Sequence, residues 1–213
     1  MNPPNSKRFQ FSIKFILITV LILSTTLVCV RLLVVPYLHQ RSIQACFQII
    51  LDDDGTLAVG GRPNATYDDI LLLAKYEGPS VAFIDLSLTK INKFDFFDEF
   101  ENCETLILNG KKLSKSDIVC ISKLPKLEYF FAYGCNLDDE KVLELAASSK
   151  LRIVHIGNNS LLKTSTILEF VKQVEDLEVL DISGNNFEED IENIKSEVLK
   201  IRPDLRFFDF TSL

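Results

Sequence analysis

The chain has 213 residues, of which 47% are hydrophobic and 25% charged, and its formal net charge is −7. This length and composition exclude a wholly disordered chain and leave room for one ordinary domain plus an appendage. The charge is uneven, because no acidic residue precedes Asp52 and the remaining chain carries 30 acidic against 18 basic residues. So acidic a domain argues against nucleic acid as a partner, since nucleic-acid binding needs a basic surface.

A basic tail at residues 1–14 leads into a long apolar segment. Residues 15–30 contain no charged side chain, and the apolar run resumes after Arg31 until Pro36 ends it. As a helix, residues 15–35 would be about 31 Å long, which is enough to cross the hydrocarbon core of a bilayer. We therefore predict a transmembrane signal-anchor helix at residues 15–35, in contact with the lipid bilayer.

A cleaved signal peptide is the alternative interpretation of the same segment. The apolar core of a signal peptide normally has 7–15 residues and precedes a cleavage site of small residues. Here the apolar run is longer and no such site follows it. Basic residues before the span slightly outnumber those at or after its far end. We therefore expect a single-pass protein with a cytoplasmic N-terminus and an extracytoplasmic repeat domain.

Residues 36–80 are the least regular part and are interpreted as a juxtamembrane linker and an N-terminal cap. Two short strands are predicted at Cys46–Leu51 and Thr56–Val59, joined by a turn at Asp52–Gly55. A helix is predicted at Tyr67–Tyr76. The hydroxyl of Thr66 is expected to cap this helix. The three aspartates of the turn suggest calcium, but the spacing of a calcium loop is absent, so a plain turn is favoured.

Residues 81–213 repeat the pattern L-x-x-L-x-L-x-x-N/C-x-L. Five copies in register and a truncated last one begin at Val81, Cys103, Leu127, Leu151, Leu177 and Leu205. The starting points are 22 to 28 residues apart, which is inside the range typical of this repeat. One copy arises easily in a leucine-rich chain, whereas five consecutive copies in register do not.

In each repeat, positions 1, 4 and 6 are expected to point into the core, and the second half is expected to return as a helix. Four such helices are predicted, at Ser116–Lys123, Asp138–Ser148, Ser165–Val174 and Glu188–Lys200. An asparagine or cysteine at the ninth position is expected to bond backbone groups of the neighbouring turn. Thr89 and Lys111 depart from this pattern.

With these repeats, the chain from residue 81 resembles the leucine-rich-repeat family, and residues 135–146 resemble its cysteine-containing subclass. The basic tail, the single span and the repeats together resemble small membrane-anchored bacterial leucine-rich-repeat proteins. This resemblance implies an α/β solenoid with short parallel strands on a concave face and helices on a convex face, preceded by one transmembrane helix. In F-box proteins such repeats present ubiquitination substrates, but no F-box segment is visible here.

No catalytic motif is present. The chain has two histidines, His39 and His155, and none of the common hydrolase, nucleotide-binding, zinc-protease or C-x-x-C patterns. The five cysteines are interpreted as small buried hydrophobic residues. We therefore expect neither enzymatic activity nor a cofactor or metal.

The expected binding surface is the concave face, where positions 3, 5 and 7 of each strand point outward. The candidate binding residues are Tyr129, Phe131, Tyr133, Ile107, His155, Asp85 and Asp181. Clustered exposed aromatic residues rimmed by acids are typical of protein-binding sites, although the rings could also simply cover one another. The predicted function is a membrane-anchored, non-catalytic module that binds a protein partner. The alternatives are a spacer subunit of a membrane complex or a substrate-recognition subunit acting with a separate enzyme.

Overall fold

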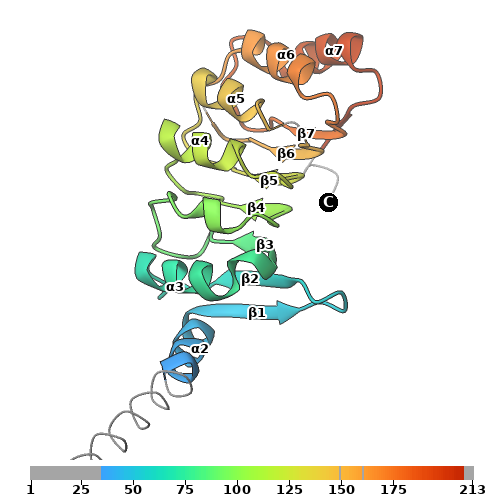
Figure 1. Ribbon diagram of the computed structural model, residues 1–213. Helices are drawn as coiled ribbons and strands as arrows, with labels where there is room; N and C mark the ends of the chain where they lie inside the picture. Colours follow the sequence, from blue (N-terminus) through green and yellow to red (C-terminus); the bar gives the residue numbers. More distant parts are fainter. Residues whose placement is uncertain (1–34, 149, 160, 209–213) are drawn as a thin grey trace, which may run out of the picture. The chain divides into compact units, whose positions relative to one another are not determined.

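The computed structural model describes residues 35–208 except residues 149 and 160 (Figure 1). The chain divides into two units, residues 1–42 and residues 43–213. Helix α2 (Val35–Cys46) begins in the first unit and ends in the second. All other elements described below belong to the second unit.

The second unit is built on one eight-stranded sheet, in which the strands follow each other in chain order. β1 and β2 form an antiparallel hairpin, and all later neighbours pair in parallel. The strands are β1 (Phe47–Leu51), β2 (Leu57–Gly61), β3 (Val81–Asp85), β4 (Thr105–Ile107), β5 (Tyr129–Phe131), β6 (Ile153–His155), β7 (Val179–Asp181) and β8 (Arg206–Phe207).

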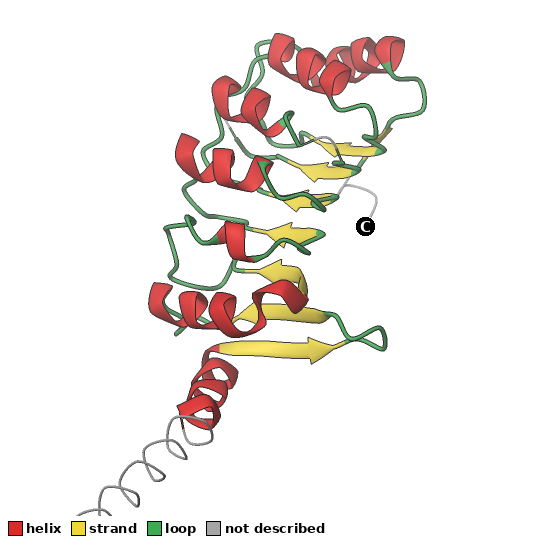
Figure 2. Cartoon of the chain, viewed as in Figure 1, coloured by secondary structure: helices red, strands yellow, loops and turns green. Residues whose placement is uncertain are grey.

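Helices connect most of the parallel strands and lie on one face of the sheet, as Figures 1 and 2 show. They are α3 (Tyr67–Glu77), η2 (Gly78–Ser80), η3 (Phe97–Glu99), α4 (Lys115–Ser122), α5 (Asp139–Leu145), α6 (Thr164–Gln173) and α7 (Ile191–Ile201). The opposite face of the sheet carries no helix among the described residues, and we call it the open face. The core lies between the sheet and the helices.

One side chain of each central strand enters this core at the same level. The strand register pairs Ile84 with Leu106, Leu106 with Phe130, Phe130 with Val154, and Val154 with Leu180. All five side chains are completely buried, which makes a continuous apolar row across five strands. Hydrophobic burial shared between neighbours is what stabilises each short strand, because no repeat can cover its own apolar face.

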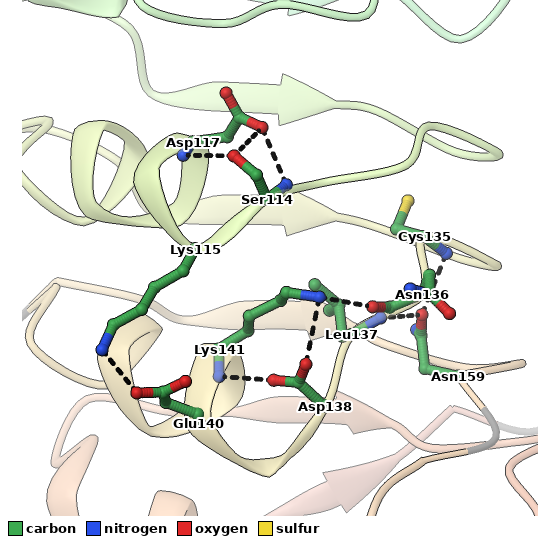
Figure 3. Close-up of polar contacts among 10 residues, drawn as sticks. All are labelled: Ser114, Lys115, Asp117, Cys135, Asn136, Leu137, Asp138, Glu140, Lys141 and Asn159. Carbon is green, nitrogen blue, oxygen red and sulfur yellow. Dashed lines mark hydrogen bonds and ion pairs between the residues drawn. The ribbon is translucent and has the colours of Figure 1, made fainter.

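The helices begin at the residues that local chemistry favours. Thr66 and Asp69 form a capping box at the start of α3, and Ser114 and Asp117 form another at the start of α4 (Figure 3). At the start of α5, the Asp138 side chain accepts the backbone N–H of Lys141 at 3.0 Å. α3 to α7 lie within a few residues of the ranges expected from the sequence.

The connection between β3 and β4 departs from the others, because its only helix is the single turn η3. Four phenylalanines, Phe94, Phe96, Phe97 and Phe100, fill the space instead and are almost completely buried. The ring centroids of Phe96 and Phe97 are 4.8 Å apart, and those of Phe94 and Phe97 are 6.1 Å apart. Aromatic bulk therefore covers the sheet here where a longer helix covers it elsewhere.

Buried polar groups at the ninth repeat position join successive turns. Asn159 is completely buried, and its Nδ2 donates to the carbonyl oxygens of Ala132, Ile156 and Gly157 at 2.9–3.0 Å. Lys111 departs from the repeat pattern but occupies the ninth position of its repeat. Its ammonium group donates to the Thr89 hydroxyl at 3.2 Å and to the Thr89 carbonyl oxygen. Burial lowers the pKa of Lys111.

The fold class inferred from the sequence requires correction. The predicted span at residues 15–35 lies outside the described residues apart from Val35, and among the described helices none is both long and apolar enough to cross a membrane. α2 has 12 residues, about 18 Å of helix. Pro36, at which the apolar run was expected to end, lies in the first turn of α2. The described chain is an α/β fold with a mostly parallel eight-stranded sheet. Because none of its described helices could cross a membrane, the predicted solenoid behind a transmembrane helix was the wrong description. The predicted single-pass localisation, with its orientation, was wrong for the same reason.

Candidate functional site

The candidate site lies on the open face of the sheet, between β4 and β8. A cavity of about 910 Å³ opens there, and it is lined by Asn109, Phe131, Tyr133, Ile153, His155, Val179, Ser183, Arg206 and Phe208. These residues come from consecutive strands and from the turns that follow them. The parallel register places Ile153 beside Val179, and Phe131 beside His155, so the floor of the cavity is continuous across β5, β6 and β7.

Aromatic rings form one wall of the cavity. The ring centroid of His155 lies 4.7 Å from that of Phe131 and 5.0 Å from that of Phe208. Tyr133 stands at the rim with 43% of its surface exposed. The wall therefore offers rigid apolar surface with a single hydroxyl, which is the kind of surface that anchors a hydrophobic side chain.

A buried carboxylate lies beneath His155. Nδ1 of His155 is 3.6 Å from Oδ2 of Asp181, and the Asp181 side chain is completely buried. The other oxygen of Asp181 accepts the backbone N–H of Ser183 at 2.8 Å, which forms the turn at the end of β7. Burial lowers the pKa of His155, and the charge of Asp181 opposes this shift.

An ion-pair network borders the site along the residues that directly precede β5, β6 and β7. Nε and Nη2 of Arg152 donate to Glu178 Oε1 at 2.8 and 2.7 Å, and Nη1 donates to Glu128 at 3.2 Å and to the Tyr129 hydroxyl at 3.3 Å. These contacts raise the pKa of Arg152 above its usual range. Arg206 is 3.8 Å from Glu178 and 72% exposed, and it lines the cavity.

The structure divides the seven predicted site residues into two groups. Phe131, Tyr133 and His155 line the cavity, whereas Tyr129, Ile107, Asp85 and Asp181 do not. The side chains of the two aspartates stabilise the turns that follow their strands. Asp85 accepts the backbone N–H of Ser87 at 2.9 Å, and Asp181 accepts that of Ser183. Tyr129 bonds Arg152, and Ile107 lies in the neighbouring strand β4.

Four of the remaining lining residues, Asn109, Ile153, Val179 and Ser183, occupy outward strand positions that the repeat pattern identifies. Arg206 and Phe208 escaped that pattern because the last repeat is shifted by one residue. Alignment on Leu205 pairs Phe208 with Leu180, but in the structure Phe207 pairs with Leu180 and packs against the core. A one-residue slip exchanges the faces of a strand, so Arg206 and Phe208 reach the open face. The final spacing of 28 residues, the longest of the five, was the available signal.

No cluster of three or more potential metal ligands occurs among the described residues. The cavity instead offers apolar contact and a few hydrogen-bonding groups at its rim. No family model matches this chain, and no curated protein is significantly similar to it in sequence. The interpretation of the site therefore rests on its own geometry.

Proposed function

We propose that this chain is a leucine-rich-repeat module that binds a partner protein through the open face of its sheet and catalyses no reaction itself. The cavity at β5–β8 is the observation that carries the proposal. Its volume of about 910 Å³ falls within the range of ligand sites and accommodates several side chains.

The chemistry of the lining indicates what the partner presents. Phe131, Ile153, Val179 and Phe208 offer apolar surface, and Asn109, Ser183 and Arg206 offer hydrogen-bonding groups at the edges. An apolar anchor surrounded by a polar rim is the usual organisation of a protein-binding hot spot. A short peptide segment with one or two large apolar side chains fits this arrangement.

Peptide selection with matched charge variants tests the proposal. Twelve-residue peptides are selected from a random display library against the full chain, and the affinity of the best sequence is measured by fluorescence anisotropy. Ile153→Glu and Val179→Glu place a charge in the cavity, so we expect each to weaken binding at least tenfold. Leu199→Glu places the same charge on the exposed surface of α7 and serves as the control.

Two results would contradict the proposed site. The first is a selected peptide that binds Ile153→Glu as tightly as the unaltered chain. The second is an equal loss of binding in Leu199→Glu, since that variant leaves the cavity unchanged. Circular dichroism and urea unfolding of all three variants establish that each of them is folded before its affinity is compared.

A further inference from the structure

The N-terminal edge of the sheet is formed by β1, which lies first in the strand order and has a neighbour on one side only among the described strands. Its sequence, Phe-Gln-Ile-Ile-Leu, contains no charge, proline or glycine. Ile50 is 53% exposed and Leu51 is 68% exposed. An apolar edge strand of this kind is a template for pairing with another strand, and proteins that stay monomeric usually interrupt it with a charge, a bulge or a proline.

The hydrogen-bond pattern of the hairpin shows which backbone groups face outward. Arg62 donates to the carbonyl of Cys46 and Asp52 donates to the carbonyl of Thr56, both at 2.9 Å. Because antiparallel bonding alternates along a strand, the peptide groups of Gln48 and Ile50 face β2. Those of Phe47, Ile49 and Leu51 face the outer edge.

The two ends of β1 carry opposite charges. Asp52, Asp53 and Asp54 follow its last residue and are exposed. At the other end, the exposed Arg62 follows β2 and sits beside Cys46. The edge is therefore a short apolar strand with an acidic end and a basic end.

We propose that β1 pairs antiparallel with β1 of a second copy of this chain, about a two-fold axis at Ile49. In this register Phe47 lies opposite Leu51 of the second copy, and the outward peptide groups form about six backbone hydrogen bonds. Arg62, Cys46 and Asp52 of the second copy, each next to the end of a strand, then lie side by side across the junction. Arg62 and that aspartate are about 10 Å apart between Cα atoms and on the same face, within reach of an ion pair that occurs twice by symmetry.

Charge, strand length and symmetry argue against the other ways of extending the sheet. A parallel pairing of two β1 strands brings one acidic triplet beside the other and leaves Arg62 without an acidic neighbour across the junction. Pairing of β1 with β8 of another copy is limited to the two residues of β8 and would build open filaments instead of a closed dimer. The antiparallel β1 pair uses all five residues and matches opposite charges.

Sedimentation equilibrium of the full chain over a wide concentration range tests the proposal, with all samples in the same buffer. We expect a dimer whose dissociation constant rises with salt. Arg62→Asp and Asp52→Arg should each weaken dimerisation about tenfold, whereas the double variant should recover most of the affinity, because the charges are exchanged and not removed. Lys126→Asp, an exposed charge reversal remote from β1, should leave the dimer unchanged.

A second variant tests the backbone pairing. Ile49→Pro removes an N–H that faces the outer edge and leaves the bonds between β1 and β2 in place, so it should abolish the dimer while the chain stays folded. The proposal is overturned by a monomer at every concentration, by a dimer that survives Ile49→Pro in a folded chain, or by a double charge variant no tighter than the single ones. If Ile49→Pro prevents folding, the charge exchange alone decides.

Discussion

The side-chain oxygen of Asn159 accepts the backbone N–H of Cys135, one repeat earlier, at 2.9 Å (Figure 3). The same oxygen accepts the N–H of Leu137 at 2.9 Å. Between these two residues lies Asn136, whose φ of 56° is in the left-handed region. One completely buried side chain therefore fixes a tight turn in the preceding repeat and satisfies both donors that flank it.

Replacing this asparagine should destabilise the fold strongly. Asn159→Ala leaves the N–H groups of Cys135 and Leu137 buried without their acceptor, so we expect the free energy of unfolding to fall by about 2–4 kcal/mol. Urea unfolding followed by circular dichroism measures the change. Asn186→Ala, at an exposed neighbouring asparagine, is the control and should change stability by less than about 0.5 kcal/mol. A loss equal to the control would contradict the assigned role.

Local patterns in the sequence predicted many individual elements. Thr66 was expected to cap a helix, and α3 begins directly after it, with Asp69 completing a capping box. The apolar positions Leu106, Phe130, Val154 and Leu180 were identified from the repeat and are all buried. Capping and burial are local or periodic properties, so one sequence is enough to reveal them.

The cavity was less predictable, for two physical reasons. Phe207 and Phe208 satisfy an apolar position equally well, so the pattern could not fix the register of β8, and Arg206 and Phe208 were missed. In addition, Asp85 and Asp181 looked like an acidic rim, but their carboxylates bond the N–H groups of Ser87 and Ser183. The sequence shows which residue types a face carries, but it does not show which of their side chains already form hydrogen bonds within the fold.

The stability of the fold should depend on the protonation of His155. Burial lowers its pKa below the usual value of about 6.5, so the unfolded chain takes up a proton at a higher pH than the folded chain does. The contribution of the neutral imidazole is complete above pH 6.5 and is lost as the pH falls from about 6.5 to the folded-state pKa.

Urea unfolding at several pH values between 5 and 7.5 measures this dependence. His155→Gln should flatten it, because glutamine does not titrate. Asn186→Gln, an exchange between two exposed side chains that do not titrate, should retain the wild-type dependence. An unchanged pH dependence in His155→Gln would show that another group is responsible.

The network around Arg152 should contribute stability that salt screens. Arg152→Met keeps much of the apolar stem but leaves Glu128 and Glu178 without the cation that binds both. We expect a lower free energy of unfolding in 50 mM salt and a smaller difference from wild type in 1 M salt. Lys126→Met serves as the control for loss of an exposed positive charge. A difference that does not depend on salt would indicate lost packing instead of lost ion pairing.

A glycine at the edge of the cavity should be required for its shape. A Cβ added to Gly157 would lie 2.6 Å from the carbonyl oxygen of Ser183 and 3.0 Å from Cδ2 of Tyr133, both in residues that line the cavity. Gly157→Ala should therefore force the β7 turn or the Tyr133 ring to move, lowering the free energy of unfolding by about 1–3 kcal/mol and weakening peptide binding.

Gly60→Ala is the matched control on β2, because the nearest atom to its added Cβ is Cβ of Gln48 at an ordinary 3.9 Å. It should leave peptide binding unchanged and change stability by less than about 1 kcal/mol. Unfolding and fluorescence anisotropy of the two variants together separate a general cost of losing glycine from a specific effect on the cavity. Equal results for Gly157→Ala and Gly60→Ala would mean that the close approach of the turns after β6 and β7 does not shape the site, because only the Cβ added to Gly157 would meet residues that line the cavity.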